Sequence, residues 1–136
     1  MQPITIAKMV PLHNSTPVLL PPEFVEKSIG EARSALLILT SHSQIIRLIP
    51  TQSPLGVKVV VGTSELSSDF FLEIEQIFSR NKLKSLYCTG LCLTQDACTY
   101  ESYFDLSESS ISENQLKEEI SQLKGVYHVE LFKLKA

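Results

Sequence analysis

The spacing of apolar residues changes period near the middle of the chain, and this change most constrains the fold. Val57, Val59 and Val61 alternate with other residues, as in a strand with one apolar face. The apolar residues that follow have helical spacing instead: Phe70, Phe71, Ile74, Ile77 and Phe78. Ser67 stands where a helix N-cap is favoured, and Asp69 falls in the first turn. We therefore expect a strand followed by a helix that packs on a sheet.

A second helix and a final strand follow near the end of the chain. Ser112 and Gln115 have the spacing of a capping box, and Gly125 is placed as a C-terminal cap. The apolar stripe between them consists of Leu116, Ile120 and Leu123. In the closing strand we expect Tyr127, Val129 and Leu131 to face the helices, and Val126, His128, Glu130 and Phe132 to face away.

All three cysteines fall between Ser85 and Leu106, in a segment that reads as two strands. If Gln95 and Asp96 form the turn, Leu93 faces Cys98, and Cys88 and Cys92 lie on the opposite face from Cys98. Four residues of strand separate two thiols by about 13 Å, whereas two thiolates on one zinc ion lie within about 5 Å. We therefore expect no metal site. An odd number of cysteines without a signal peptide favours reduced thiols, used as small apolar side chains.

These elements predict strand, helix, strand, strand, helix, strand over residues 56–135. This is the α+β ferredoxin-like βαββαβ order, with both helices on one face of a four-stranded antiparallel sheet. We predict an interface on the other face, which is unusually apolar for solvent. Its residues are Val60, Cys88, Cys92, Tyr103 and Phe132. A partner subunit or the N-terminal segment would cover it, and the alternative is a partly exposed face flanked by charged side chains.

The first half reads as a small β-rich unit. Two prolines and a glycine between Pro50 and Gly56 indicate a linker, which predicts domains at residues 1–52 and 53–136. We expect strands in ITIAKMV and TPVLL, a short helix that begins at Pro22, and a hairpin from SALLILTS and QIIRLIPT with Ser43 near its turn.

Composition and motifs exclude several classes of function. The net charge of −3 gives no global attraction to nucleic acid or to an anionic membrane. No run reaches the ~18 apolar residues of a membrane span, and the first residues lack the apolar core of a signal peptide, so we expect a cytoplasmic protein that does not contact membranes. The sequence contains no GxSxG, P-loop, GxGxxG or HExxH motif. We expect no enzyme and no cofactor, unless subunits assemble a site between them.

The βαββαβ order together with LKGVYHVELFKL resembles the ACT domain over residues 56–135. The resemblance implies a regulatory, non-enzymatic domain that pairs with a second copy and binds a small metabolite, such as an amino acid. It implies a ligand site in the connection between the first strand and the first helix. The residues there are Gly62, Thr63, Ser64, Ser67 and Ser68, whose hydroxyls and helix N-terminal amides suit an anionic group.

The run PVLLPPEFVEKSIG followed by two strands resembles the AbrB-like swapped-hairpin fold. That resemblance implies interlocked subunits and DNA contact through basic residues, which here are Lys8, His13 and Arg47. The leading hypothesis is therefore a homodimeric regulatory protein, in which metabolite sensing is coupled to DNA binding or transcription regulation. The alternative is an interaction or dimerisation module that binds neither ligand nor DNA.

Overall fold

The computed structural model describes residues 5–12, 17–40, 42–106, 109 and 111–136. The chain forms two compact units, Met1–Glu31 and Ala32–Ala136. The hairpin that we expected in the N-terminal unit belongs to the second of these. A division into separately folding domains at residue 52 stays a prediction. Among the described residues, no helix is long and apolar enough to cross a bilayer.

The first unit contains helix α1, Pro22–Ser28, which begins at Pro22 as predicted. Proline suits this first helical position because its missing amide hydrogen would have no partner there. The two strands expected in ITIAKMV and TPVLL are wrong, since the described residues of both segments, 5–10 and 17–20, form none. This stretch contains three prolines, which cannot donate to a sheet ladder: Pro11, Pro17 and Pro21.

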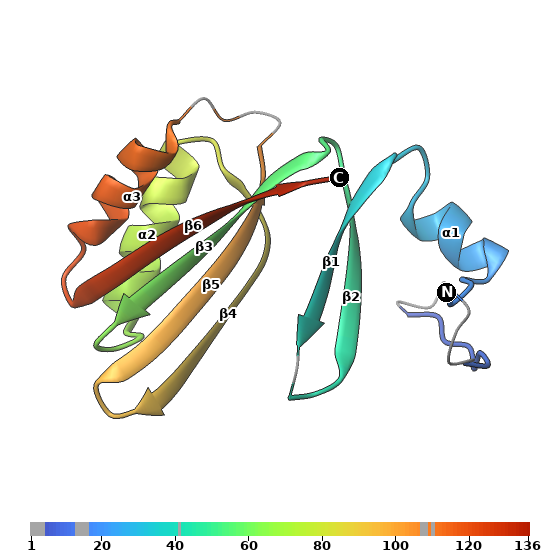
Figure 1. The fold of residues 1–136 in the computed structure, drawn as a ribbon, viewed down its shortest axis with the longest axis horizontal. Coiled ribbons are helices and arrows are strands. Elements are labelled where there is room, and N and C mark those ends of the chain that lie inside the picture. Colours follow the sequence, from blue (N-terminus) through green and yellow to red (C-terminus); the bar gives the residue numbers. More distant parts are fainter. Residues whose placement is uncertain (1–4, 13–16, 41, 107–108, 110) are drawn as a thin grey trace. The chain divides into compact units, whose positions relative to one another are not determined.

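The second unit is α+β, with two antiparallel sheets. Its elements are β1 (Ser34–Thr40), β2 (Ile45–Thr51), β3 (Leu55–Thr63), α2 (Ser68–Arg80), β4 (Lys84–Thr94), β5 (Ala97–Asp105), α3 (Glu113–Ser121) and β6 (Val126–Lys135). Strands β1 and β2 form the predicted hairpin, with Ser43 in the turn. The other four strands form one sheet in the order β4-β5-β3-β6, and α2 and α3 cover one of its faces (Figure 1). Each of these helices connects two parallel strands that have one antiparallel strand between them.

The core lies between this sheet and its two helices. The side chains of Val57, Val59 and Val61 are buried, as the alternation predicts. From α2, Phe70 and Phe78 make edge contacts with Tyr100 and Phe104 of β5. Both predicted N-caps are present: Ser67 Oγ accepts from the amide of Phe70 at 3.1 Å, and Ser112 Oγ accepts from the amide of Gln115 at 3.1 Å.

The register between β4 and β5 differs by one residue from the prediction. Thr94 pairs with Ala97 across the expected turn, but the register then shifts, and Cys92 rather than Leu93 pairs with Cys98. Because side chains alternate along a strand, this shift moves the residues from Tyr87 to Cys92 to the opposite face from the one predicted. A second shift, between Ser85 and Tyr87, reverses the change for the start of β4. Cys88 and Cys92 therefore lie on the helix side of the sheet with Cys98, and not on the face where we placed them.

This register overturns the expectation of reduced thiols. Cys92 and Cys98 form a disulfide, with their Cα atoms 3.9 Å apart, and Cys88 is a free, exposed thiol. The reason is the same irregularity near Leu93, because it brings the two sulfurs onto one face as direct cross-strand neighbours.

The start of β6 also departs from simple alternation. Gly62 pairs with His128 and Thr63 pairs with Val126, so the register skips Tyr127. Val126, which we placed on the face away from the helices, packs against the core instead. Tyr127, which we expected to face the helices, is 62% exposed.

Candidate functional site

The predicted ligand residues lie where β3 ends and α2 begins. Gly62 and Thr63 are the last two residues of β3, and Ser68 is the first residue of α2. The backbone amide of Ser64 donates to the carbonyl oxygen of Gly125 at 2.9 Å, which ties this loop to the turn before β6. The fold therefore joins two segments that are about sixty positions apart in the sequence, the loop after β3 and the turn before β6.

Two glycines allow the loop to lie close to its neighbours. A Cβ atom on Gly125, whose φ is +87°, would fall 2.6 Å from Ser64 Oγ. A Cβ atom on Gly90 of β4 would fall 2.8 Å from Leu66 Cδ1. Both distances are shorter than any ordinary carbon contact, so each glycine leaves space that the loop fills.

Much of the hydrogen-bonding capacity of the predicted ligand residues is used inside the loop. Thr63 is fully buried, and its hydroxyl donates to the carbonyl oxygen of Glu65 at 3.2 Å. Ser67 caps α2. Ser64 is half-buried and Ser68 is exposed, so the Ser68 hydroxyl is the more accessible of the two. A ligand role for these residues stays a prediction.

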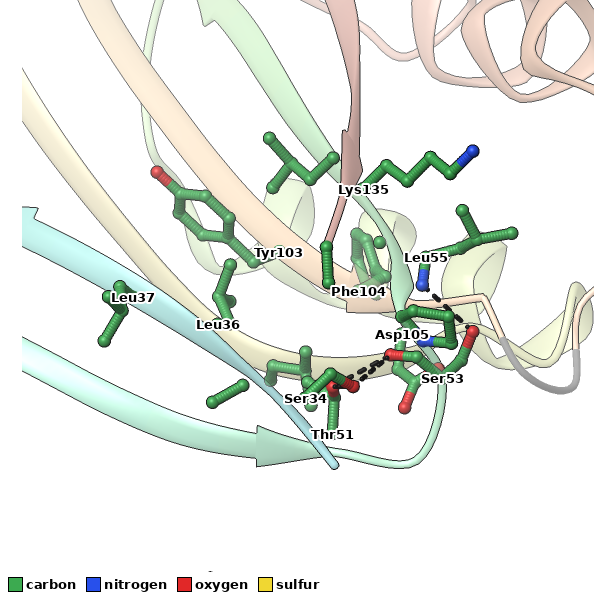
Figure 2. Close-up of a pocket in the computed structure, with 16 residues that line it drawn as sticks. Ser34, Leu36, Leu37, Thr51, Ser53, Leu55, Tyr103, Phe104, Asp105 and Lys135 are labelled. Atoms are coloured by element: carbon green, nitrogen blue, oxygen red, sulfur yellow. Dashed lines mark hydrogen bonds between the residues drawn. The ribbon is translucent and has the colours of Figure 1, made fainter. Parts of the chain in front are cut away.

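The structure adds a cavity that the sequence did not indicate, between the β1–β2 hairpin and the end of the four-stranded sheet (Figure 2). Its volume is about 190 Å³, and the walls are mainly apolar. The hairpin contributes Leu36, and the sheet contributes Leu55, Tyr103 and Phe104 (Figure 2). No periodicity points to such a space, because it depends on how the hairpin packs on the sheet.

Polar groups at one end of this cavity fix the hairpin to the sheet. Ser34 Oγ lies 2.8 Å from Thr51 Oγ1, and both hydroxyls donate to the carbonyl oxygen of Ser53 (Figure 2). The amide of Gln52 donates to Asp105 Oδ2 at 3.0 Å. The carboxylate of Asp105 is almost fully buried, and a charged acceptor of this kind strengthens the bond it receives.

A second cavity, of about 380 Å³, lies between the turn end of the hairpin and the sheet face that points away from the helices. Tyr87 and Tyr103 line it, with ring centroids 6.4 Å apart. Arg47 lies over the Tyr87 ring at 4.8 Å, and its guanidinium donates to Thr40 Oγ1 at 3.1 Å. The hairpin therefore lies over the part of the sheet face around these tyrosines.

Charge on this face is balanced locally. Lys58 forms an ion pair with Glu101 at 3.4 Å and lies 5.6 Å from the centroid of Tyr103. Burial, the largest single influence, lowers the pKa of Lys58, but Tyr103 and Glu101 together raise it above its ordinary value. On the helix side, burial raises the pKa of the Tyr100 phenol. Neither group is thereby prepared to exchange protons near neutral pH.

The predicted DNA-binding residues are not brought into one cluster by the second unit. Lys8 is an exposed residue of the first unit, Arg47 packs on Tyr87 in the second, and His13 lies outside the described residues. Of the predicted interface residues, Val60, Tyr103 and Phe132 lie on the face away from the helices, whereas Cys88 and Cys92 do not. Their roles in DNA binding and in an interface stay predictions. Over the described part of the chain, no group of three His, Cys, Asp or Glu side chains is arranged to hold a metal ion.

Comparison with known proteins does not assign this chain to a family. The sequence matches no protein-family model, and no curated protein matches it. The ACT and AbrB resemblances therefore rest on the residues and on the arrangement of the elements.

We predict that Gly125→Ala destabilises the second unit by about 1–3 kcal/mol, because alanine is strained at positive φ and its Cβ would collide with Ser64 Oγ. Urea unfolding of Gly125→Ala, Ser64→Ala and the double variant measures the coupling between the two sites. Removal of the Ser64 hydroxyl should recover more than about 0.5 kcal/mol of the loss. An equal Gly125→Ala penalty in both backgrounds would show that the Cβ atom at position 125 does not collide with the Ser64 hydroxyl.

Proposed function

We propose that this protein is a non-enzymatic, homodimeric regulator, in which an ACT-like unit binds a small metabolite and an N-terminal AbrB-like segment carries the response to DNA. In this proposal residues 56–135 form a ferredoxin-like domain, and the metabolite occupies the connection from Gly62 to Ser68. The β1–β2 hairpin belongs to the AbrB-like segment and links it to the sheet.

The observation that carries the proposal is the strand order β4-β5-β3-β6, with α2 and α3 on one face. Each helix joins two parallel strands that flank an antiparallel one, which is the connection expected of a split βαβ unit. In such an order β3 is an inner strand, and its carboxyl end leads through a short loop to the N-terminus of α2. Backbone amides at a helix N-terminus favour an anionic group, such as the carboxylate of a small metabolite.

Regulation requires that the ligand distinguish two states of the protein. The loop after β3 contacts β4 through Leu66 and Gly90, and it contacts the turn before β6 through Ser64 and Gly125. Strands β4 and β6 are the two edges of the sheet. A ligand that orders this loop would therefore bias both edges, where a second copy of the chain would pair.

We expect a thermal-shift screen of amino acids, nucleotides and other small metabolites to identify a ligand class. A specific ligand at a hundredfold excess over its dissociation constant stabilises the protein by about 2.7 kcal/mol. Ser68→Ala should reduce this stabilisation, because the Ser68 hydroxyl is exposed at the start of α2. Ser79→Ala, near the other end of the same helix, is the matched control and should leave the shift unchanged. A flat screen of the folded protein would contradict metabolite sensing.

DNA binding, if present, should weaken steeply with salt because released counterions drive it. We expect Lys8→Gln to weaken binding at every sequence and to reduce the salt slope by about one. Because Lys8 is exposed, this change should not affect folding. Mobility-shift measurements at low salt test the expectation, and unchanged mobility of DNA with the wild-type protein would contradict it.

The alternative function is an interaction or dimerisation module that senses nothing. The observation in its favour is the outer face of the hairpin, where Leu37 pairs with Leu48 and Leu39 pairs with Ile46. Leu37, Leu39 and Ile46 are each about two-thirds exposed, at 65%, 66% and 69%. A contiguous exposed apolar face of this kind commonly marks a protein contact.

We expect the wild-type protein to sediment as a dimer and Ile46→Lys to shift it towards monomer, because a charge would have to be buried in the contact. Leu72→Lys is the matched control, since Leu72 is 62% exposed on α2 and Ile46 is 69% exposed on β2. Analytical ultracentrifugation measures both. If Ile46→Lys and the control give the same mass as wild type, the hairpin face is not the contact.

A further inference from the structure

The proposed function does not use the disulfide between β4 and β5. Cys92 on the edge strand pairs directly with Cys98 on β5, and the bond closes the tip of the hairpin around Gln95 and Asp96. The two cysteines differ in access. Cys98 is 1% exposed, whereas Cys92 is exposed.

The buried half of this disulfide lies against the loop that follows β3. Cys98 pairs with Thr63 across β3 and β5, and Cys98 Sγ is 4.0 Å from the carbonyl oxygen of Ser64. In the disulfide this sulfur carries no hydrogen, so the two atoms are only in contact. After reduction the thiol would have a hydrogen to donate to the same oxygen.

The other side of this loop contacts β4, the strand that contains the exposed Cys92. Leu66 packs over Gly90, two residues before Cys92 on β4. Strand β4 lies at the edge of the sheet and pairs with β5. The disulfide is a covalent link between these two strands. Loss of that link leaves the tip held by ladder hydrogen bonds and by the contacts of the loop.

We propose that Cys92–Cys98 is a reversible redox site, and that its reduction by a dithiol loosens the β4–β5 tip together with the loop at residues 64–66. The inference concerns the thiol chemistry of this chain and does not depend on a metabolite or on DNA.

The exchange proceeds in two balanced steps. A thiolate of the dithiol attacks the accessible sulfur of Cys92, forms a mixed disulfide and releases Cys98 as a thiolate, which takes up a proton. The second thiol of the reductant then attacks its own sulfur in that mixed disulfide and releases Cys92. The protein gains two electrons and two protons, and the dithiol leaves as a cyclic disulfide. Cys88 takes no part, since four residues of strand place it about 13 Å from Cys92.

Native redox titration with mass readout tests the chemistry. The full chain is equilibrated in mixtures of reduced and oxidised dithiothreitol, trapped with N-ethylmaleimide and weighed intact. We expect one adduct, on Cys88, in the oxidised protein and three after reduction, with full return on reoxidation. Cys88→Ser is the control and should give none and two. Three adducts under all conditions, or one adduct until denaturant is added, would each overturn the proposal.

Hydrogen–deuterium exchange of the same samples tests the structural response. Reduction should raise exchange rates on the order of tenfold at residues 64–66 and 90–98, because the disulfide restrains local opening. Rates in α3, at Leu116–Ile120, should stay unchanged. Faster exchange throughout the sheet would mean global unfolding, and no change at residues 64–66 would mean that the loop does not depend on the bond. Either result would overturn the local switch. A Cys92→Ser/Cys98→Ser variant should match the reduced wild type in both oxidised and reduced buffer.

Discussion

The central position of β3 is the constraint on which the rest of the second unit depends. This strand pairs with β5 on one side and β6 on the other, so its backbone is satisfied along both edges. Its alternating valines then decide which face of the sheet is covered. Val59 and Val61 are fully buried, and with Ile74 of α2 they form the centre of the core. Because β3 aligns both β5 and β6 and packs under α2, a change in the register of β3 would disturb both of these pairings and the core.

The same strand explains why residues distant in sequence meet at its carboxyl end. Beyond Gly62 the pairing with β6 becomes irregular, and the chain turns into α2 through a loop that needs close backbone approach. Gly125 provides that approach on one side, where its carbonyl oxygen receives the amide of Ser64. Gly90 provides it on the other, under Leu66. The loop is therefore positioned by the absence of side chains at two points, which makes its geometry sensitive to movement of β4.

Patterns with a local cause were predictable, and those that depend on long-range pairing were not. The caps at Ser67 and Ser112, the helix beginning at Pro22 and the buried valines of β3 each follow from residues a few positions apart. The register of β4 was not predictable, because one irregularity near Leu93 reverses the face of the residues from Cys92 to Tyr87, and a second between Ser85 and Tyr87 reverses it again. The two N-terminal strands failed for a related reason. An apolar segment such as TPVLL forms a strand only if a partner strand accepts it, and composition cannot supply that partner.

The candidate sites differ in predictability for the same reason. A loop between a strand and a helix can be located from the sequence, whereas a cavity between a hairpin and a sheet cannot. A two-stranded hairpin is marginal by itself in water, so β1 and β2 depend on what they pack against. Their inner side contributes Ile38, which is buried, but cavities remain on the sheet face around Tyr103. Polar and cation–π contacts, at Asp105 and at Tyr87, also hold the hairpin. An occupant of these cavities would add contacts between the hairpin and the sheet, so binding there would also restrain the orientation of the exposed outer face of the hairpin.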